Sequence, residues 1–261
     1  MNWIRREARL IVCALQFLTR LPVPALADWE ERWSEAWLAR SARWFPLVGI
    51  IVGLLAAGVL VAAHLVWRGG ALPALLAVAV GVLVTGAFHE DGLADAVDGL
   101  FGGDTGERRL EIMKDSRIGT FGALALMLGL ALKTMALAQI FPPLAAAAAL
   151  VAAHAGGRAA AVVVMARAPY AADPGASKLK PTARGVRGWE AAFALVLGAM
   201  PLLLLSPSAA LAGTVVGAFA AACPAVAAWR RVGGWTGDVL GAVEQAFEIG
   251  FLLGVAGAVR F

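Results

Sequence analysis

Acidic residues in this 261-residue sequence are concentrated in one short window. Eight of the 18 Asp and Glu lie between residues 90 and 115. Asp91, Asp95 and Asp98 have the i, i+4 and i+7 spacing that places side chains on one face of a helix. No Lys or Arg precedes Arg108 within the window to pair with them. Carboxylates without a basic partner favour a hard divalent cation such as Mg²⁺, and a solvated loop face is the alternative.

Basic residues follow these carboxylates directly. They are interleaved with two further acids that stand four positions apart, and the whole group is Arg108, Arg109, Glu111, Lys114, Asp115 and Arg117. On a helix, the Arg side chains would make forked contacts with phosphate and the Lys would act as a point charge. Glu111 and Asp115 are additional candidate metal ligands, and salt bridges within the helix are the alternative. Metal-binding carboxylates beside phosphate-binding cations are what phosphoryl transfer requires.

The elements that must position these residues are membrane helices. A composition that is 61% hydrophobic and 15% charged, with a mean hydropathy of +0.78, excludes an ordinary water-soluble enzyme. We predict an all-α bundle in a single membrane domain, 1–261, with the catalytic segment at 89–117. Residues 1–44 form an N-terminal region whose amphipathic helix lies at the membrane interface; a cleaved signal peptide is the alternative.

Seven apolar runs are candidates for transmembrane helices. They are residues 45–67, 71–88, 118–141, 144–166, 189–205, 208–229 and 238–259. Two runs are short and the last carries Glu244 and Glu248, so six or eight spans are the alternatives. We expect the second run to continue as a helix through 89–99, carrying the three aspartates out of the membrane.

The basic residues predict the orientation of the bundle. With the N-terminus inside, all but four of the 22 Lys and Arg fall in inner segments, where cytoplasmic loops concentrate them. The exceptions are Arg68, Lys133, Arg158 and Arg260. This distribution places the N-terminus and the active site in the cytoplasm and the C-terminus outside.

Polar residues inside the spans are further candidates. Arg158 should face protein or a watery cavity, either reaching the phosphates or pairing structurally. Lys133 is expected to extend outward, and His154 to be a satisfied core histidine. The last span carries an inward-facing stripe with Asp238 at its cytoplasmic start, the best candidate there for metal or nucleotide contacts; the stripe is Asp238, Gly241, Gln245 and Glu248.

Small residues recur at helical spacing in three spans. The pairs are Gly49 with Gly53, Gly213 with Gly217, and Gly250 with Gly254. Such spacing favours close contacts between membrane helices and makes a homo-oligomer plausible, although packing within one chain is the simpler interpretation.

Several segments form longer motifs, namely residues 17–24, 44–49, 89–95 with 98–99, 113–119 and 236–242. On these motifs the chain resembles the cobalamin synthases, also called adenosylcobinamide-GDP ribazoletransferases, over most of its length. The resemblance implies a Mg²⁺-dependent enzyme of the bacterial inner membrane. It would join adenosylcobinamide-GDP with α-ribazole or its 5′-phosphate and release GMP. It would work within the lipid bilayer, without nucleic acid.

The same resemblance implies roles for individual residues. The metal at Asp91, Asp95 and Asp98 would bridge the diphosphate while a ribazole hydroxyl attacks the phosphorus that bears cobinamide. We hypothesise that one of these aspartates, or His89, takes the hydroxyl proton; for His89 the alternative is a hydrogen-bonded histidine at the helix end. Arg20, in the first motif, joins the residues that bind substrate or phosphate.

Two other classes of protein are alternatives. A CDP-alcohol phosphotransferase also uses aspartates and glycines on membrane helices, but its signature places Ala-Arg where this sequence has Ala94-Asp95. A cation transporter would also use carboxylates within the membrane, typically near the midplane. Most acids here lie at or beyond the span ends, so both alternatives are weaker.

Overall fold

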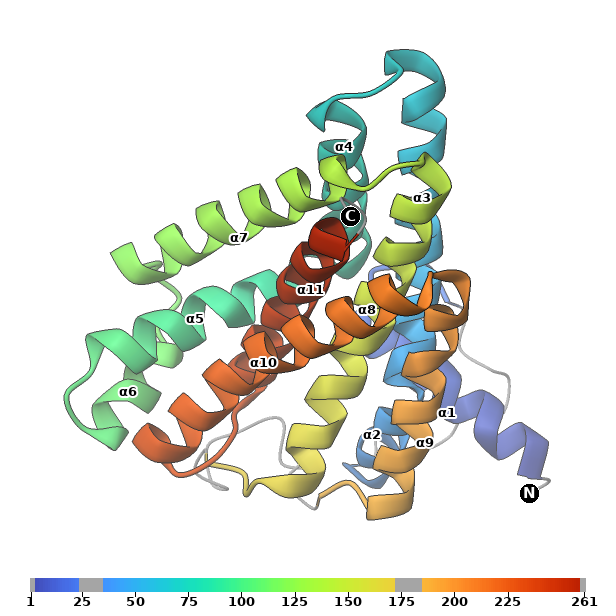
Figure 1. Cartoon of the computed structure of the whole chain (residues 1–261). Helices are drawn as coiled ribbons and strands as arrows, with labels where there is room; N and C mark the ends of the chain where they lie inside the picture. Colours follow the sequence, from blue (N-terminus) through green and yellow to red (C-terminus); the bar gives the residue numbers. More distant parts are fainter. Residues whose placement is uncertain (1–2, 24–34, 172–184, 259–261) are drawn as a thin grey trace.

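The computed structural model describes residues 3–23, 35–171 and 185–258 (Figure 1). Nearly all of these residues are helical, and these ranges contain no strand, only an isolated bridge between Tyr170 and Trp235. The predicted all-α class is therefore confirmed.

Most of the helices follow one another closely, and longer intervals separate α1 from α2 and α8 from α9. In chain order they are α1 (Trp3–Leu18), α2 (Glu35–Ser41), η1 (Ala42–Trp44), α3 (Phe45–Trp67), α4 (Ala71–Thr85), α5 (Phe88–Gly102), α6 (Gly106–Met113), α7 (Thr120–Gln139), α8 (Pro143–Arg167), α9 (Gly188–Ala199), η3 (Met200–Leu204), α10 (Pro207–Val232) and α11 (Gly237–Ala258). Each of the seven predicted apolar runs coincides with a helix or a pair of helices.

Length and apolar composition identify the helices able to cross a membrane. Within the described ranges there are five, comprising Trp37–Trp67, which includes α3, and helices α7, α8, α10 and α11. A sixth results if α4 and α5, bent by 89° at their junction, form one broken span, and Gly188–Leu204 is a shorter apolar helix. The chain is a multi-pass membrane protein, while the count of seven stays a prediction.

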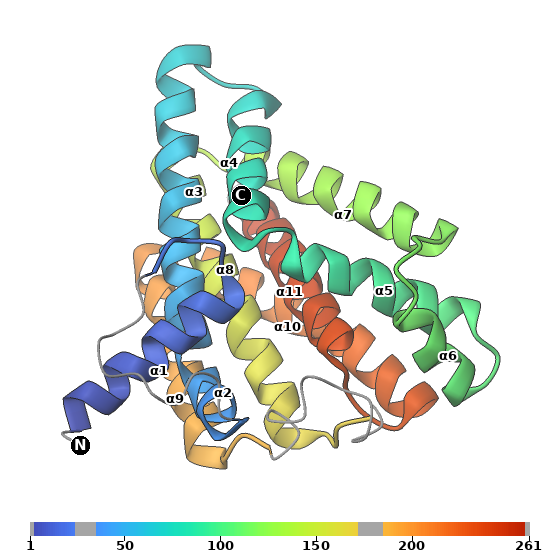
Figure 2. The ribbon, with the colours of Figure 1, turned by 180° about the vertical axis from the view of Figure 1, so that it is seen from behind.

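Helix α11 lies at the centre of the bundle and contacts α5, α7, α8 and α10. Helices α3 and α4 project together at one end, while α5, α7 and α10 run obliquely across the molecule (Figures 1 and 2). Residues from most of the bundle therefore meet along α11.

Glycines set the closest helix contacts. A Cβ on Gly254 of α11 would collide with the Ala212 carbonyl of α10, and a Cβ on Gly49 of α3 would collide with the His154 carbonyl of α8. The prediction of close helix contacts at these small residues is confirmed. Because the contacts lie within one chain, they give no support to a homo-oligomer.

Helix α1 is amphipathic, with Leu10, Cys13, Ala14 and Leu18 buried on one face. From its polar side, the Glu7 carboxylate accepts hydrogen bonds of 2.7 Å from Arg43 of η1. Arg43 also pairs at 3.0 Å with Glu190 of α9, so three separate segments meet at one guanidinium. The amphipathic helix is confirmed, and its position at a membrane interface stays a prediction.

Candidate active site

The predicted catalytic segment begins at a sharp break between α4 and α5. Gly86 and Ala87 both have left-handed backbone conformations, with φ of 67° and 59°, and the chain turns by 89° there. The expectation that the second span continues as one helix through 89–99 is therefore wrong. Gly86 permits the turn because it has no Cβ, which the left-handed conformation disfavours.

Arg20 lies against this break. Its backbone N–H donates to the Val84 carbonyl at 2.7 Å. A Cβ on Gly86 would approach Arg20 Nε to 2.6 Å, so the absence of a side chain there makes room for the guanidinium. The structure thus brings the first motif to the start of α5.

The predicted aspartates gather beside the start of α11. Asp91 is exposed and Asp95 is half-buried on α5, and Asp238 enters from the first turn of α11. The helices approach closely here, since a Cβ on Gly92 would lie 3.1 Å from the Asp238 carbonyl oxygen. The charges acting on Asp95 are those of Asp91, Asp238 and Asp98, all negative. We call Asp91, Asp95 and Asp238 the carboxylate group.

Asp98 is engaged differently. Its side chain is buried, and its two carboxylate oxygens accept hydrogen bonds from the backbone N–H of Gly119 at 2.7 Å and of Gly122 at 2.8 Å. These donors belong to the first turn of α7, whose N–H groups have no partner within the helix. Asp98 therefore anchors α7 to α5, a function that sequence reasoning missed.

The second acidic pair is not brought into the carboxylate group. Helix α6 ends at Met113, so Asp115 lies beyond it and does not share its face with Glu111. Glu111 pairs with Arg108 at 2.9 Å. Arg117 donates hydrogen bonds to Asp115, and these lower the pKa of that carboxyl to about 2. Local salt bridges, the alternative raised from the sequence, thus describe both pairs.

The other predicted phosphate ligands differ in how far they are exposed. Lys114 is exposed at the end of the helix. Arg109 is half-buried against Gly103, and its Nε has no hydrogen-bond partner. Arg158 lies elsewhere, 2% exposed in the interior of α8.

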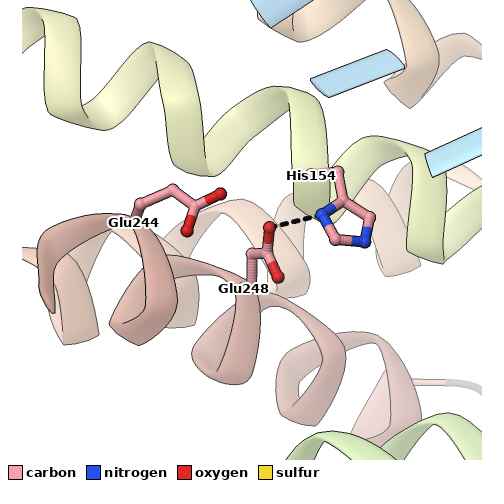
Figure 3. A group of neighbouring side chains, drawn as sticks. All are labelled: His154, Glu244 and Glu248. Carbon is pink, nitrogen blue, oxygen red and sulfur yellow. Dashed lines mark ion pairs between the residues drawn. The ribbon is translucent and has the colours of Figure 1, made fainter. Parts of the chain in front are cut away.

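Arg158 belongs to a buried ionic cluster that also contains Lys133, His154, Glu244 and Glu248. Arg158 Nη1 lies 2.6 Å from Glu244 Oε1, and His154 Nδ1 lies 2.6 Å from Glu248 Oε1. Figure 3 shows the two carboxylates of α11 facing His154 of α8. Lys133 Nζ lies 2.5 Å from Glu248 Oε2.

This cluster corrects one expectation and confirms another. Lys133 does not extend outward but turns inward, 3% exposed, because Glu248 offers it an opposite charge inside the bundle. His154 is a satisfied core histidine, as predicted, because it is buried and paired with Glu248. The inward direction of the polar stripe on α11 is confirmed, since Gln245 and Glu248 are both buried.

The three groups His154, Glu244 and Glu248 are close enough to hold a metal ion, their ligand atoms lying within 4.8 Å of one another. Arg158 Nη1, however, lies within 3.3 Å of both carboxylates. A cationic side chain therefore already supplies the positive charge that a metal would bring, and the cluster is better described as ion pairs.

The ionic cluster connects to the start of α5. His89 Nδ1 lies 3.5 Å from Glu244 Oε2, and the Gln245 amide donates to Glu90 Oε1 at 3.0 Å. These two α5 residues directly precede Asp91. The buried contacts thus hold the first turn of α5, and with it the carboxylate group, against α11.

Comparison with known proteins identifies the family. The profile described as cobalamin-5-phosphate synthase matches residues 10–256. The chain belongs to the cobalamin-5-phosphate synthase family. Every candidate residue named above lies within the matched range, so the site belongs to the part that defines the family.

Curated relatives cover nearly the whole chain. An adenosylcobinamide-GDP ribazoletransferase of Leptothrix cholodnii is 44% identical over 274 residues, covering 98% of this chain and 97% of its own. The protein of the same name from Shewanella amazonensis is 39% identical over 253 residues, 95% of each chain. No solved structure matches the chain.

Proposed function

We propose that this chain joins adenosylcobinamide-GDP to α-ribazole, or to α-ribazole 5′-phosphate, and releases GMP. Membership of the family and the shared name of its relatives support the reaction. The ribazole hydroxyl oxygen forms a bond to the phosphorus that bears cobinamide. The bond between that phosphorus and the oxygen that bridges the two phosphorus atoms breaks. GMP leaves and keeps the bridging oxygen.

The carboxylate group is the observation that carries this proposal. Three carboxylates from two helices lie near one another, since Asp91 and Asp238 both act on Asp95 as negative charges. Their oxygens are not as close together as the ligand atoms of His154, Glu244 and Glu248, so the side chains would have to converge on the ion. Oxygen ligands of this kind suit Mg²⁺, so Asp91, Asp95 and Asp238 are the residues that would hold it. Bound Mg²⁺ would neutralise diphosphate oxygens and stabilise the departing GMP. Asp98 would contribute by positioning, because its oxygens are already hydrogen-bonded to α7.

The basic residues of the α6 region bind the substrate phosphates in this proposal. Arg108, Lys114 and Arg117 are exposed, and the acids paired with the two arginines, Glu111 and Asp115, can be exchanged for phosphate oxygens. Arg109 has a buried Nε without a hydrogen-bond partner among the described residues, which leaves a donor for a ligand. Arg20 lies at the α4–α5 break, just before the first turn of α5.

The proton of the attacking hydroxyl passes to a carboxylate oxygen rather than to His89. His89 is 5% exposed and its Nδ1 faces Glu244 inside the bundle. Asp91 and Asp95 are more open to the surface. This leaves His89 to hold the start of α5 through Glu244.

The active site and the N-terminus lie on the cytoplasmic side of the bacterial inner membrane in this proposal. The support is the concentration of Lys and Arg in the N-terminal, 108–117, 167–187 and 230–231 segments. Arg231 donates a hydrogen bond of 2.5 Å to the Leu100 carbonyl of α5, so the basic end of α10 lies beside the helix that carries Asp91 and Asp95.

The test uses the purified full chain in lipid bilayers with adenosylcobinamide-GDP, α-ribazole and Mg²⁺, and measures released GMP. The wild-type protein is expected to release GMP, and its failure to do so would overturn the proposal. Asp95→Asn should reduce turnover by at least about 10-fold, since even residues behind metal ligands contribute that much. Glu107→Gln, an exposed acid of the same segment, is the matched control and should retain turnover. Normal turnover of Asp95→Asn in saturating Mg²⁺ would remove Asp95 from the site.

A further inference from the structure

A pocket lies beside the first turns of α11, the helix that also carries Asp238. Its walls come from α1, α3, α5, α8 and α11, and the residues that matter here are Phe17, Phe45, Phe88, His89, Arg158 and Trp235. We call it the aromatic pocket. Gly237 and Leu240 also line it, and they flank Asp238 in the sequence. A ligand in this pocket therefore lies next to the proposed reaction site.

The walls suit a flat and mostly apolar ring. Phe17 stacks on Phe45 with ring centroids 5.9 Å apart and meets the edge of Phe88 at 5.3 Å. Trp235 is 2% exposed and fixed by a hydrogen bond from its Nε1 to the Ala168 carbonyl at 3.0 Å. Aromatic side chains bind planar ligands through stacked and edge-to-face contacts, and such pockets use only a few polar groups for orientation.

The polar lining consists of His89, Arg158 and Glu244. Arg158 is 2% exposed, and among the described residues its Nε has no hydrogen-bond partner, although Nη1 is engaged by three groups. Leaving a charged donor buried and unpaired is costly, so this N–H calls for an acceptor. His89 and Glu244 already face each other at 3.5 Å, so the Arg158 Nε is the lining donor left for a ring with one hydrogen-bond acceptor.

We propose that the aromatic pocket binds the benzimidazole base of α-ribazole, with the Arg158 guanidinium donating to the ring nitrogen that carries no ribose. This inference rests on the proposed function, because ribazole is the substrate it assigns. A benzimidazole has an apolar bicyclic body and one free nitrogen acceptor. Guanine, the base of the other substrate, has several donors and acceptors, and the polar lining residues that could meet them, His89, Arg158 and Glu244, are already paired with one another.

The pocket must widen to admit the ring. Its free volume is about 50 Å³, which is room for a few water molecules. Phe88 is the most exposed of the four aromatic side chains, at 39%, whereas Phe45 is 6% exposed. A rotamer change of Phe88 is therefore the smallest movement that opens the pocket, and such changes on binding are common.

The test compares Phe88→Leu with Phe193→Leu in the full chain. Phe193 is a matched control because it is also an aromatic residue in an edge-to-face pair, is 37% exposed, and lies outside the pocket. Phe88→Leu should raise the KM for α-ribazole by about 10-fold and leave the KM for adenosylcobinamide-GDP unchanged. Equilibrium dialysis with labelled α-ribazole, without Mg²⁺ or the second substrate, should show the same loss of affinity.

An altered ligand tests the role of Arg158 without disturbing the ionic cluster. An indole riboside, in which a C–H replaces the free ring nitrogen, should bind the wild-type protein about 10-fold more weakly than α-ribazole. Equal binding of both ribosides would overturn the hydrogen bond to Arg158. If Phe88→Leu instead raises the KM for adenosylcobinamide-GDP alone, the pocket belongs to that substrate and the inference is wrong. Failure of the wild-type protein to release GMP would count against the proposed function. Dialysis measures α-ribazole binding independently of GMP release, so it tests the pocket separately.

Discussion

The three regularly spaced aspartates of α5 differ in burial and in hydrogen bonding. Asp91 and Asp95 stand on α5 among other negative charges, whereas Asp98, less than one turn further on, is buried and accepts two backbone N–H groups of α7. A carboxylate that caps a helix stabilises the fold without any ligand, while mutually repelling carboxylates destabilise it until a cation binds. Stability in the absence of metal therefore separates the two roles.

Asp98→Ala should lower the free energy of unfolding by about 1.5–3 kcal/mol, because two hydrogen bonds to a charged acceptor are lost. Asp95→Asn should leave stability unchanged or raise it, since it removes repulsion. Thermal unfolding in detergent without Mg²⁺ measures both variants. The assignment fails if Asp98→Ala is as stable as Asp95→Asn.

The contribution of Lys133 to stability depends on its ion pair with Glu248. Lys133→Met would leave Glu248 buried with one counter-charge fewer and should cost about 3–5 kcal/mol of unfolding free energy. Combining it with Glu248→Gln removes the uncompensated charge and should recover much of the loss. Thermal unfolding of the single and double variants tests this, and equal destabilisation of both would contradict the ion pair.

At the scale of elements, the break between α4 and α5 decides where the chemistry is placed. If the two helices were continuous, the aspartates would extend along the axis of α4. The 89° turn instead lays α5 across α11, so that Asp238 joins Asp91 and Asp95. The closeness of the crossing depends on Gly92 and Gly241, because a Cβ on Gly241 would lie 3.0 Å from the His89 carbonyl oxygen.

Gly86→Ala should destabilise the protein by about 1–2 kcal/mol, the cost of a left-handed conformation for a residue with a Cβ. It should also reduce GMP release, because the added methyl group displaces Arg20. Gly58→Ala, in the interior of α3 with nothing within 4 Å of its added Cβ, is the control and should stabilise by roughly 0.5–1 kcal/mol. Thermal unfolding and GMP release are measured for both. Unchanged values for Gly86→Ala would show that the turn does not need glycine.

At the scale of the whole molecule, α11 connects the proposed reaction site with the buried ionic cluster. Its first turn carries Asp238, and its later turns carry the buried Glu244 and Glu248, paired with α7 and α8. One side of the bundle thus holds the exposed carboxylates, and charge deeper in the bundle is balanced internally. The exposed carboxylates can meet the phosphorylated substrates only if their side of the bundle faces the compartment that contains those substrates.

The orientation predicts how introduced cysteines react in intact cells. In a Cys223→Ser background, with Cys13 buried, a membrane-impermeant thiol reagent should label Ser208→Cys from outside. Glu107→Cys should be labelled only in inverted vesicles, because α6 is cytoplasmic in the proposal. Labelling of Glu107→Cys in intact cells would reverse the orientation and move the active site to the other face.

The sequence by itself determined the helical class, the position of each apolar run, the pairing of Asp91 with Asp95 on one helix, and the inward stripe on α11. These features follow from periodicity and composition, which depend only on residues close together in the sequence. Only the tertiary structure decided the turn at Gly86, the entry of Asp238 into the carboxylate group, the capping of α7 by Asp98, and the pairing of Lys133 with Glu248. Those contacts join residues on different helices. Whether a buried charge finds a partner depends on how the helices cross, and the spacing within either helix does not specify that.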